Sequence, residues 1–63
     1  MDVRYYELNG APVEDDGCIP KRYVNGAPVL YYDIERFVHS ANPISKEQFD
    51  AMVAEQKAKA RRE

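Results

Sequence analysis

The chain has 63 residues, a formal net charge of −2, one cysteine and one histidine. A chain of this length forms one small domain at most, and folding buries only ~60% of the surface that the unfolded chain exposes. A single cysteine excludes an internal disulfide, and Cys18 with His39 cannot complete a Cys₂His₂ or Cys₄ zinc site. The composition therefore predicts a fold without a cofactor that depends on tight packing, on self-association or on a partner.

Neither a targeting signal nor a membrane span is expected. The N-terminus lacks the basic region and apolar stretch of a secretory signal, and the longest apolar run, 27–32, is far below the ~20 residues of a membrane helix. We therefore expect a cytoplasmic protein, which suits an unpaired thiol. Residues 1–32 carry five acids and three bases (net −2), whereas residues 33–63 carry six of each, so broad affinity for nucleic acid is not expected.

A repeated pentapeptide organises the first half of the chain. Asn-Gly-Ala-Pro-Val occurs at 9–13 and again at 25–29. Asn-Gly favours a two-residue type I′ hairpin turn, which needs positive φ at both residues. Asp16-Gly17 is a further turn signal. Residues 1–32 are thus predicted to form an antiparallel meander of three or four short strands.

Three prolines refine this meander. Pro12 places its segment at a sheet edge or among the first residues of a strand, because proline cannot donate to the ladder. Pro20 limits hydrogen bonding of the next strand to Lys21 onward. Pro28 leaves two alternatives open: a last strand over 27–32, or a helix that begins at Pro28.

Residues 33–63 are predicted to be the helical half of this single domain. Asp33 is a good N-cap, and the following apolar residues recur with helical spacing, at Ile34, Phe37, Val38 and Ala41. The helix should end near residues 40–41, because the residue before Pro43 is disfavoured in the α region.

The final helix has the clearest start. Ser45 and Gln48 form a capping-box pattern, with Ile44 and Phe49 spaced as a hydrophobic staple. Beyond Val53 its apolar residues are only alanines, so the end of this helix is expected to fray or to lie on a partner.

The sequence thus predicts an α+β fold, in which the strand meander is followed by two C-terminal helices packed on one face. The predicted core combines apolar residues of both halves. It consists of Val3 or Tyr6, Leu8, Ile19, Val24, Val29, Tyr31, Ile34, Phe37, Val38, Ile44, Phe49, Met52 and Val53.

No catalytic constellation can be assembled from the sequence, so we expect a protein that is not an enzyme. His39 lies off the apolar stripe of its helix and is expected on the surface. Cys18 adjoins Ile19 and is expected to pack rather than to act as a nucleophile. The three glycines are turn residues and not a phosphate-binding loop.

Tyrosines and one acidic loop are the candidate contacts with another protein. Tyr5-Tyr6 and Tyr31-Tyr32 are adjacent pairs, so one member of each pair should point to each face of its strand. Exposed tyrosine is enriched at interfaces. We therefore predict a small regulator or inhibitor, of a kind encoded by a phage or other mobile element, that binds another protein; a homodimer is an alternative. The predicted partner-binding residues are Tyr5, Tyr6, Glu14, Asp15, Asp16, Tyr23 and Tyr32.

A second hypothesis is DNA binding. Residues 20–37, a basic hairpin followed by tyrosines, an acidic N-cap and an amphipathic helix, are similar to the wing of MerR-type regulators and phage excisionases. The resemblance implies phosphate contacts by Lys21 and Arg22 and stacking or packing by Tyr23. It covers less than a third of the chain, and residues 1–19 are strand-like where those families place a helix-turn-helix. The basic end of the last helix would add Lys57, Lys59, Arg61 and Arg62.

Overall fold

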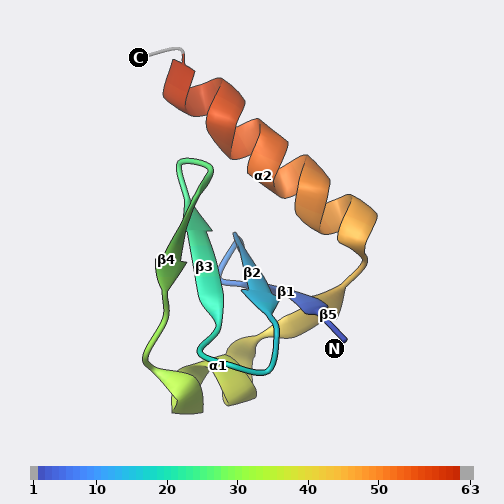
Figure 1. Cartoon of the computed structure of the whole chain (residues 1–63). Helices are drawn as coiled ribbons and strands as arrows, with labels where there is room; N and C mark the ends of the chain where they lie inside the picture. The colour runs from blue at the N-terminus through green and yellow to red at the C-terminus, as the bar shows by residue number, and fades with distance from the viewer. Residues whose placement is uncertain (1, 62–63) are drawn as a thin grey trace.

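The computed structural model describes residues 2–61, which form a five-stranded antiparallel sheet and two helices (Figure 1). The elements in chain order are β1 (Arg4–Leu8), β2 (Ala11–Asp15), β3 (Lys21–Val24), β4 (Ala27–Leu30), α1 (Ile34–Ser40), β5 (Asn42–Ile44) and α2 (Lys46–Arg61). The order across the sheet is β4-β3-β2-β1-β5. The predicted meander of three or four strands has four, and the α+β fold class is confirmed.

Both copies of the pentapeptide form the predicted turn. The backbone angle φ is +52° at Asn9 and +86° at Gly10, and it is +54° at Asn25 and +84° at Gly26. Positive φ at both central residues defines the type I′ turn, whose twist matches that of the flanking strands. The first turn joins β1 to β2 and the second joins β3 to β4. Because residues 27–30 are a strand, the alternative helix that begins at Pro28 is wrong.

Pro12 is the second residue of β2, a strand with neighbours on both sides. The ladder between β2 and β3 begins at Val13, opposite Arg22, so the next position in register places Pro12 opposite Tyr23. Proline has no N–H to give to the Tyr23 carbonyl. The side chain of Gln56 in α2 replaces that donor, because its Nε2 donates to the Tyr23 carbonyl at 2.8 Å.

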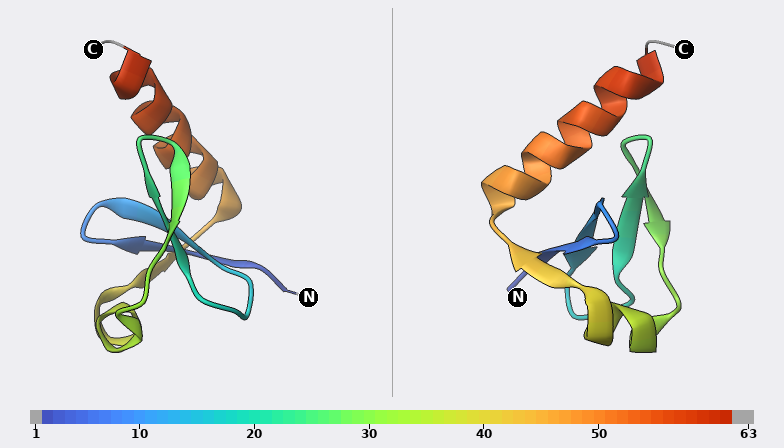
Figure 2. Two further views of the ribbon diagram at one scale, coloured as in Figure 1. Left: turned by 60° about the vertical axis from the view of Figure 1, so that its left-hand side comes forward. Right: turned by 180° about the vertical axis from the view of Figure 1, so that it is seen from behind.

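The same Gln56 amide makes a second bond to the backbone. Its Oε1 accepts the N–H of Gly26 at 3.0 Å. One side chain of α2 therefore compensates for a proline inside the sheet and attaches the helix to the β3–β4 turn. The two views of Figure 2 show α2 running past the tip of this hairpin.

The two helices pack on opposite faces of the sheet. Successive residues of a strand point to opposite faces. Tyr6 of β1 meets Phe37 of α1 with ring centroids 5.0 Å apart, whereas Tyr5 meets Phe49 of α2 at 4.6 Å. Tyr23 of β3 packs edge-on against the same Phe49 at 5.1 Å. The prediction that both helices share one face is therefore wrong; both faces of β1 carry an aromatic ring, and each ring is covered by its own helix.

The core is smaller than predicted. Among the described residues the buried hydrophobic side chains are Leu8, Val13, Phe37 and Phe49. All but Val13 were predicted. Of the alternatives Val3 and Tyr6, Tyr6 packs against the core and Val3 is exposed. Five other predicted core residues are exposed: Ile19, Val24, Val29, Ile34 and Val38. For Val29, Ile34 and Val38 the reason is geometric, because β4 is an edge strand and the seven-residue helix α1 buries only Phe37.

The helix ends follow the sequence signals. Asp33 caps α1 by accepting the N–H of Arg36 at 3.2 Å, and the helix ends at Ser40. In the capping box of α2, Ser45 Oγ accepts the N–H of Gln48 at 3.1 Å, and Gln48 Oε1 accepts the N–H of Ser45 at 3.0 Å.

Strand β5 was not predicted. This three-residue segment between the helices pairs antiparallel with β1, with Ile44 opposite Tyr5 and Pro43 opposite Tyr6. Such a short segment carries no alternating pattern of its own. Its proline suits the sheet edge, where one side of the strand has no ladder to complete.

Candidate interaction surface

The acidic loop is built into its own turn. Asp15 accepts the N–H of Gly17 at 3.0 Å, and Asp16 accepts the N–H of Cys18 at 3.1 Å. Asp16 also receives a hydrogen bond from the Lys21 ammonium at 3.1 Å. The Cys18 N–H and then Lys21 lower the pKa of the Asp16 carboxyl, and Asp16 raises the pKa of Lys21. The two predicted docking aspartates therefore already have partners within the chain.

Cys18 is exposed in this loop. The prediction that it packs is wrong, because β3 begins at Lys21 and the residues before it are not in the sheet. The start of β3 itself agrees with the limit set by Pro20.

The predicted tyrosines divide into covered and exposed rings. Tyr5, Tyr6 and Tyr23 are half-buried on the phenylalanines of the two helices. Burial, and then the charge of Glu14, raises the pKa of Tyr23. Tyr32 is different, since 69% of it is exposed.

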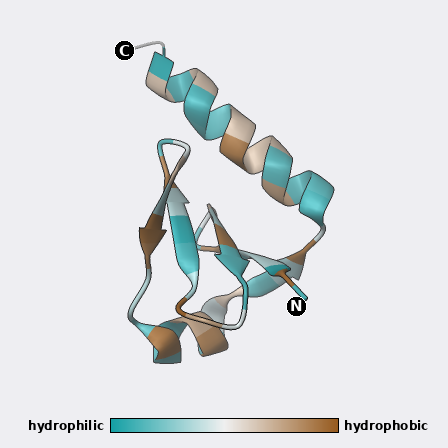
Figure 3. Ribbon diagram, viewed as in Figure 1, coloured by the Kyte–Doolittle hydropathy of each residue, from teal (hydrophilic) through white to brown (hydrophobic). Residues whose placement is uncertain are grey.

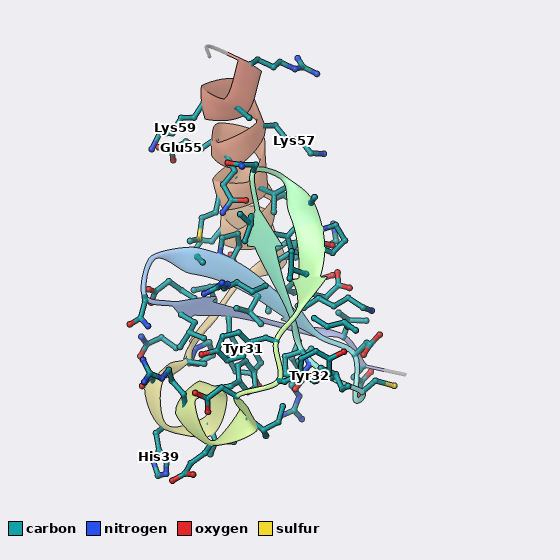
Figure 4. All side chains as sticks on the ribbon, turned by 90° about the vertical axis from the view of Figure 1, so that its left-hand side faces the viewer. Tyr31, Tyr32, His39, Glu55, Lys57 and Lys59 are labelled. Carbon is teal, nitrogen blue, oxygen red and sulfur yellow. The ribbon has the colours of Figure 1, made fainter. Side chains whose placement is uncertain are left out.

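The neighbouring Tyr31 packs against the core cluster and lies 5.4 Å below the guanidinium of Arg22. Figure 4 shows Tyr31 and Tyr32 on different sides of the segment that leads from β4 to α1. This tyrosine pair therefore has one inward and one outward ring, as expected, whereas both rings of the Tyr5-Tyr6 pair are covered.

Tyr32 is followed closely in the chain by exposed aliphatic side chains of α1. Ile34 is 45% exposed and Val38 is 70% exposed. These two residues are four apart in one helix and so lie on one face of it. We call Tyr32, Ile34 and Val38 the junction patch, because they stand where β4 leads into α1. In Figure 3 the hydrophobic colouring falls on β4 and on α1 at this end of the molecule.

The sequence reasoning assigned Ile34 and Val38 to the core and so missed them as surface residues. A signal was present in the sequence. Asp33 and Pro43 restrict the helix to about two turns, and a helix that short can direct few positions toward a sheet.

The predicted nucleic-acid residues do not share one face. Lys21 and Arg22 are consecutive in β3 and point to opposite faces, where Asp16 and Tyr31 respectively engage them. Lys59 pairs with Glu55 at 3.2 Å. Figure 4 shows Lys57 on the other side of α2 from these two residues. Arg61 is exposed, and Arg62 lies outside the described residues.

Two depressions of the described surface are open to solvent. A shallow one of about 420 Å³ is lined only by residues of α1 and its cap, namely Asp33, Glu35, Arg36, His39 and Ser40. Another, of about 130 Å³, lies between the β1–β2 turn and α2. Within residues 2–61 no three histidine, cysteine or acidic side chains gather as metal ligands. No helix of that range is long and apolar enough to cross a membrane.

Comparison with models of known protein families, with curated proteins and with solved structures found no match to this chain. The function proposed below therefore depends on the geometry of the molecule alone.

Proposed function

We propose that the chain is a non-catalytic protein-binding module that docks on another protein through the junction patch. The observation that supports this proposal is the exposure of Tyr32, Ile34 and Val38 at one junction. Isolated exposed apolar residues are ordinary on protein surfaces. Here three of them lie within residues 32–38, in a chain whose described core contains only four buried hydrophobic side chains.

The surroundings of the patch fit a protein partner. Charged residues of the same turn border it, including Asp33, Glu35 and Arg36, and the Asp33–Arg36 ion pair of 3.4 Å is exposed. An apolar centre with a polar rim is the usual anatomy of a protein interface, and tyrosine is enriched among the residues that dominate binding. The module would act as a regulator or inhibitor by covering a surface of its partner.

The test is an affinity capture from bacterial lysate, with and without nuclease treatment, washed at low and at high salt. Three forms of the chain are compared: the parent, an Ile34→Ser/Val38→Ser variant, and a Val3→Ser/Val24→Ser control. The control removes side chains that are 42% and 41% exposed and lie outside the patch. Circular dichroism establishes that all three forms fold.

We expect one stoichiometric protein to be captured by the parent and by the control in both washes, and to be lost from the patch variant. Equal capture by all three forms would overturn the proposal. Capture that disappears with nuclease or with salt would favour the basic residues and nucleic acid instead.

A further inference from the structure

The two edges of the sheet are unequal. The edge at β5 has only three residues and contains Pro43. The edge at β4 has four residues, all exposed, and no charged side chain occurs between Ala27 and Tyr32. Natural proteins usually protect an edge strand with charges, bulges, short length or a covering element. Figure 4, viewed from this side, shows β4 at the front with no ribbon across it.

The backbone groups along the outer side of β4 can be identified from the pairing with β3. Tyr31 donates its N–H to the Pro20 carbonyl at 2.8 Å, so this N–H points toward β3. The N–H and C=O of one residue point to the same side of a strand, and successive residues alternate. The outward residues of β4 are therefore Pro28 and Leu30. The same alternation carried past Tyr31 makes Tyr32, two residues after the strand ends, the next outward residue.

These outward groups form a self-complementary set. Pro28 offers only a carbonyl, because proline has no N–H. Tyr32 offers only its N–H, because its carbonyl already accepts the N–H of Ile34 at 2.9 Å. Leu30 lies midway between them and offers both a donor and an acceptor. No hydrogen bond of residues 2–61 engages any of these outward groups.

We propose that this edge pairs with the same edge of a second copy of the chain, antiparallel, with the twofold axis at Leu30. In this register the two Leu30 residues exchange both of their hydrogen bonds. Each Tyr32 N–H then donates to the Pro28 carbonyl of the other copy. Pro28 has no N–H to donate, and the Tyr32 carbonyl opposite it already accepts the N–H of Ile34. No donor or acceptor of the pair is therefore left without a partner. The two sheets become one continuous sheet.

The side chains agree with this pairing. Leu30 faces Leu30, and Pro28 faces the Tyr32 ring, so apolar groups that are exposed in the single chain cover one another. A different strand would satisfy all of these donors and acceptors only if it, too, had no N–H opposite the Tyr32 carbonyl. The dimer would also add to a core that is small for a folded domain. The dimer shares Tyr32 with the junction patch, but Ile34 and Val38 take no part in it. The Ile34→Ser/Val38→Ser variant therefore tests the proposed function, and the Leu30 variants test the dimer.

The test is sedimentation equilibrium of the full chain from about 10 μM to about 1 mM, with a reducing agent present so that Cys18 cannot form a cross-link. Leu30 faces itself across the axis, so Leu30→Glu and Leu30→Lys each place like charges in opposition. An equimolar mixture of the two variants places opposite charges in contact. Val3→Glu and Val3→Lys are matched controls, because Val3 is exposed to a similar extent (42% against 45%).

We expect the parent and both Val3 variants to dimerise, each Leu30 variant to bind itself at least about tenfold more weakly, and the mixture to regain the dimer. A parent chain that stays monomeric throughout this range overturns the proposal, and so does a dimer that the Leu30 variants leave unchanged. Leu30→Pro gives a second test, since it removes an N–H that the single chain does not use. It should remain folded and become monomeric, and a Leu30→Pro chain that is folded and still dimeric contradicts the pairing.

Discussion

Removing the Gln56 side chain should detach α2 from the β3–β4 hairpin and uncover the defect that Pro12 creates. In Gln56→Ala, the Tyr23 carbonyl loses its donor at 2.8 Å and the Gly26 N–H loses its acceptor at 3.0 Å. Both bonds are part-buried, and each contributes about 0.5–1.5 kcal/mol net. The variant should therefore lose roughly 2 kcal/mol of unfolding free energy, out of the ~3–9 kcal/mol typical of a chain of this length.

The assay is urea unfolding followed by far-ultraviolet circular dichroism. With a slope of about 1 kcal/mol/M for a small domain, the midpoint should fall by roughly 2 M. The urea midpoint of Gln56→Glu should lie between those of the parent and Gln56→Ala, because a carboxylate keeps the acceptor for the Gly26 N–H but loses the donor for the Tyr23 carbonyl. Glu55→Ala is the control on the same helix. It breaks only the exposed ion pair with Lys59 and should cost no more than about 0.5 kcal/mol.

A double-mutant cycle with Pro12→Ala tests the reasoning directly. Alanine at position 12 restores an N–H opposite the Tyr23 carbonyl, so Gln56→Ala should cost less in that background. The cycle cancels the loss of the buried proline ring itself, which is common to both arms. If Gln56→Ala costs the same in both backgrounds, or no more than Glu55→Ala, then Gln56 does not compensate for the proline.

Three further predictions concern the turns, the cap and acid. Gly26→Ala and Gly10→Ala should each lower the free energy of unfolding in urea by about 1–2 kcal/mol, because both glycines have positive φ. Gly26→Ala should cost more, since its Cβ also meets the Lys57 side chain whereas the space at Gly10 is open. Equal costs would contradict this. Ser45→Ala should cost about 1 kcal/mol through loss of the cap of α2, and an unchanged urea midpoint would count against that bond. The Gly10 N–H, and then Asn42, lower the pKa of Glu7 below 4.5. The stability contributed by this carboxylate is therefore complete above that pH and is lost as the pH falls. Between pH 7 and pH 3 the urea midpoint of Glu7→Gln should drop less than that of the parent, and an equal drop would refute this.

The repeated pentapeptide separates what the sequence could predict from what it could not. Both copies form the same turn, because a type I′ turn depends on two adjacent residues. Their valines have different fates: Val13 is fully buried, whereas Val29 is 48% exposed. Position in the sheet decides this, since β2 lies between two strands and β4 lies at an edge. No local pattern states which strand will be central.

The same distinction holds for the helices and for the candidate surface. The Asp33 cap of α1, the capping box of α2 and the Pro43 boundary involve near neighbours in the chain and were predicted. The outward ring of Tyr32 followed from its pairing with Tyr31. The exposure of Ile34 and Val38 did not, because it depends on how little of the sheet the short helix α1 covers. The bond from Gln56 to Tyr23 spans 33 positions and leaves no local signature in the sequence.

The opposite placement of the two helices gives the molecule built-in spectroscopic reporters. The chain has no tryptophan, and its tyrosine rings are divided between the faces of the sheet. Tyr5 and Tyr23 sense the phenylalanine of α2, whereas Tyr6 senses that of α1. Ring resonances in NMR can therefore follow the docking of each helix separately, without an added label. If the resonances of Tyr5 and Tyr23 and those of Tyr6 change at the same temperature, the molecule unfolds as one cooperative unit. If those of Tyr5 and Tyr23 change first, α2 leaves a sheet that persists without it.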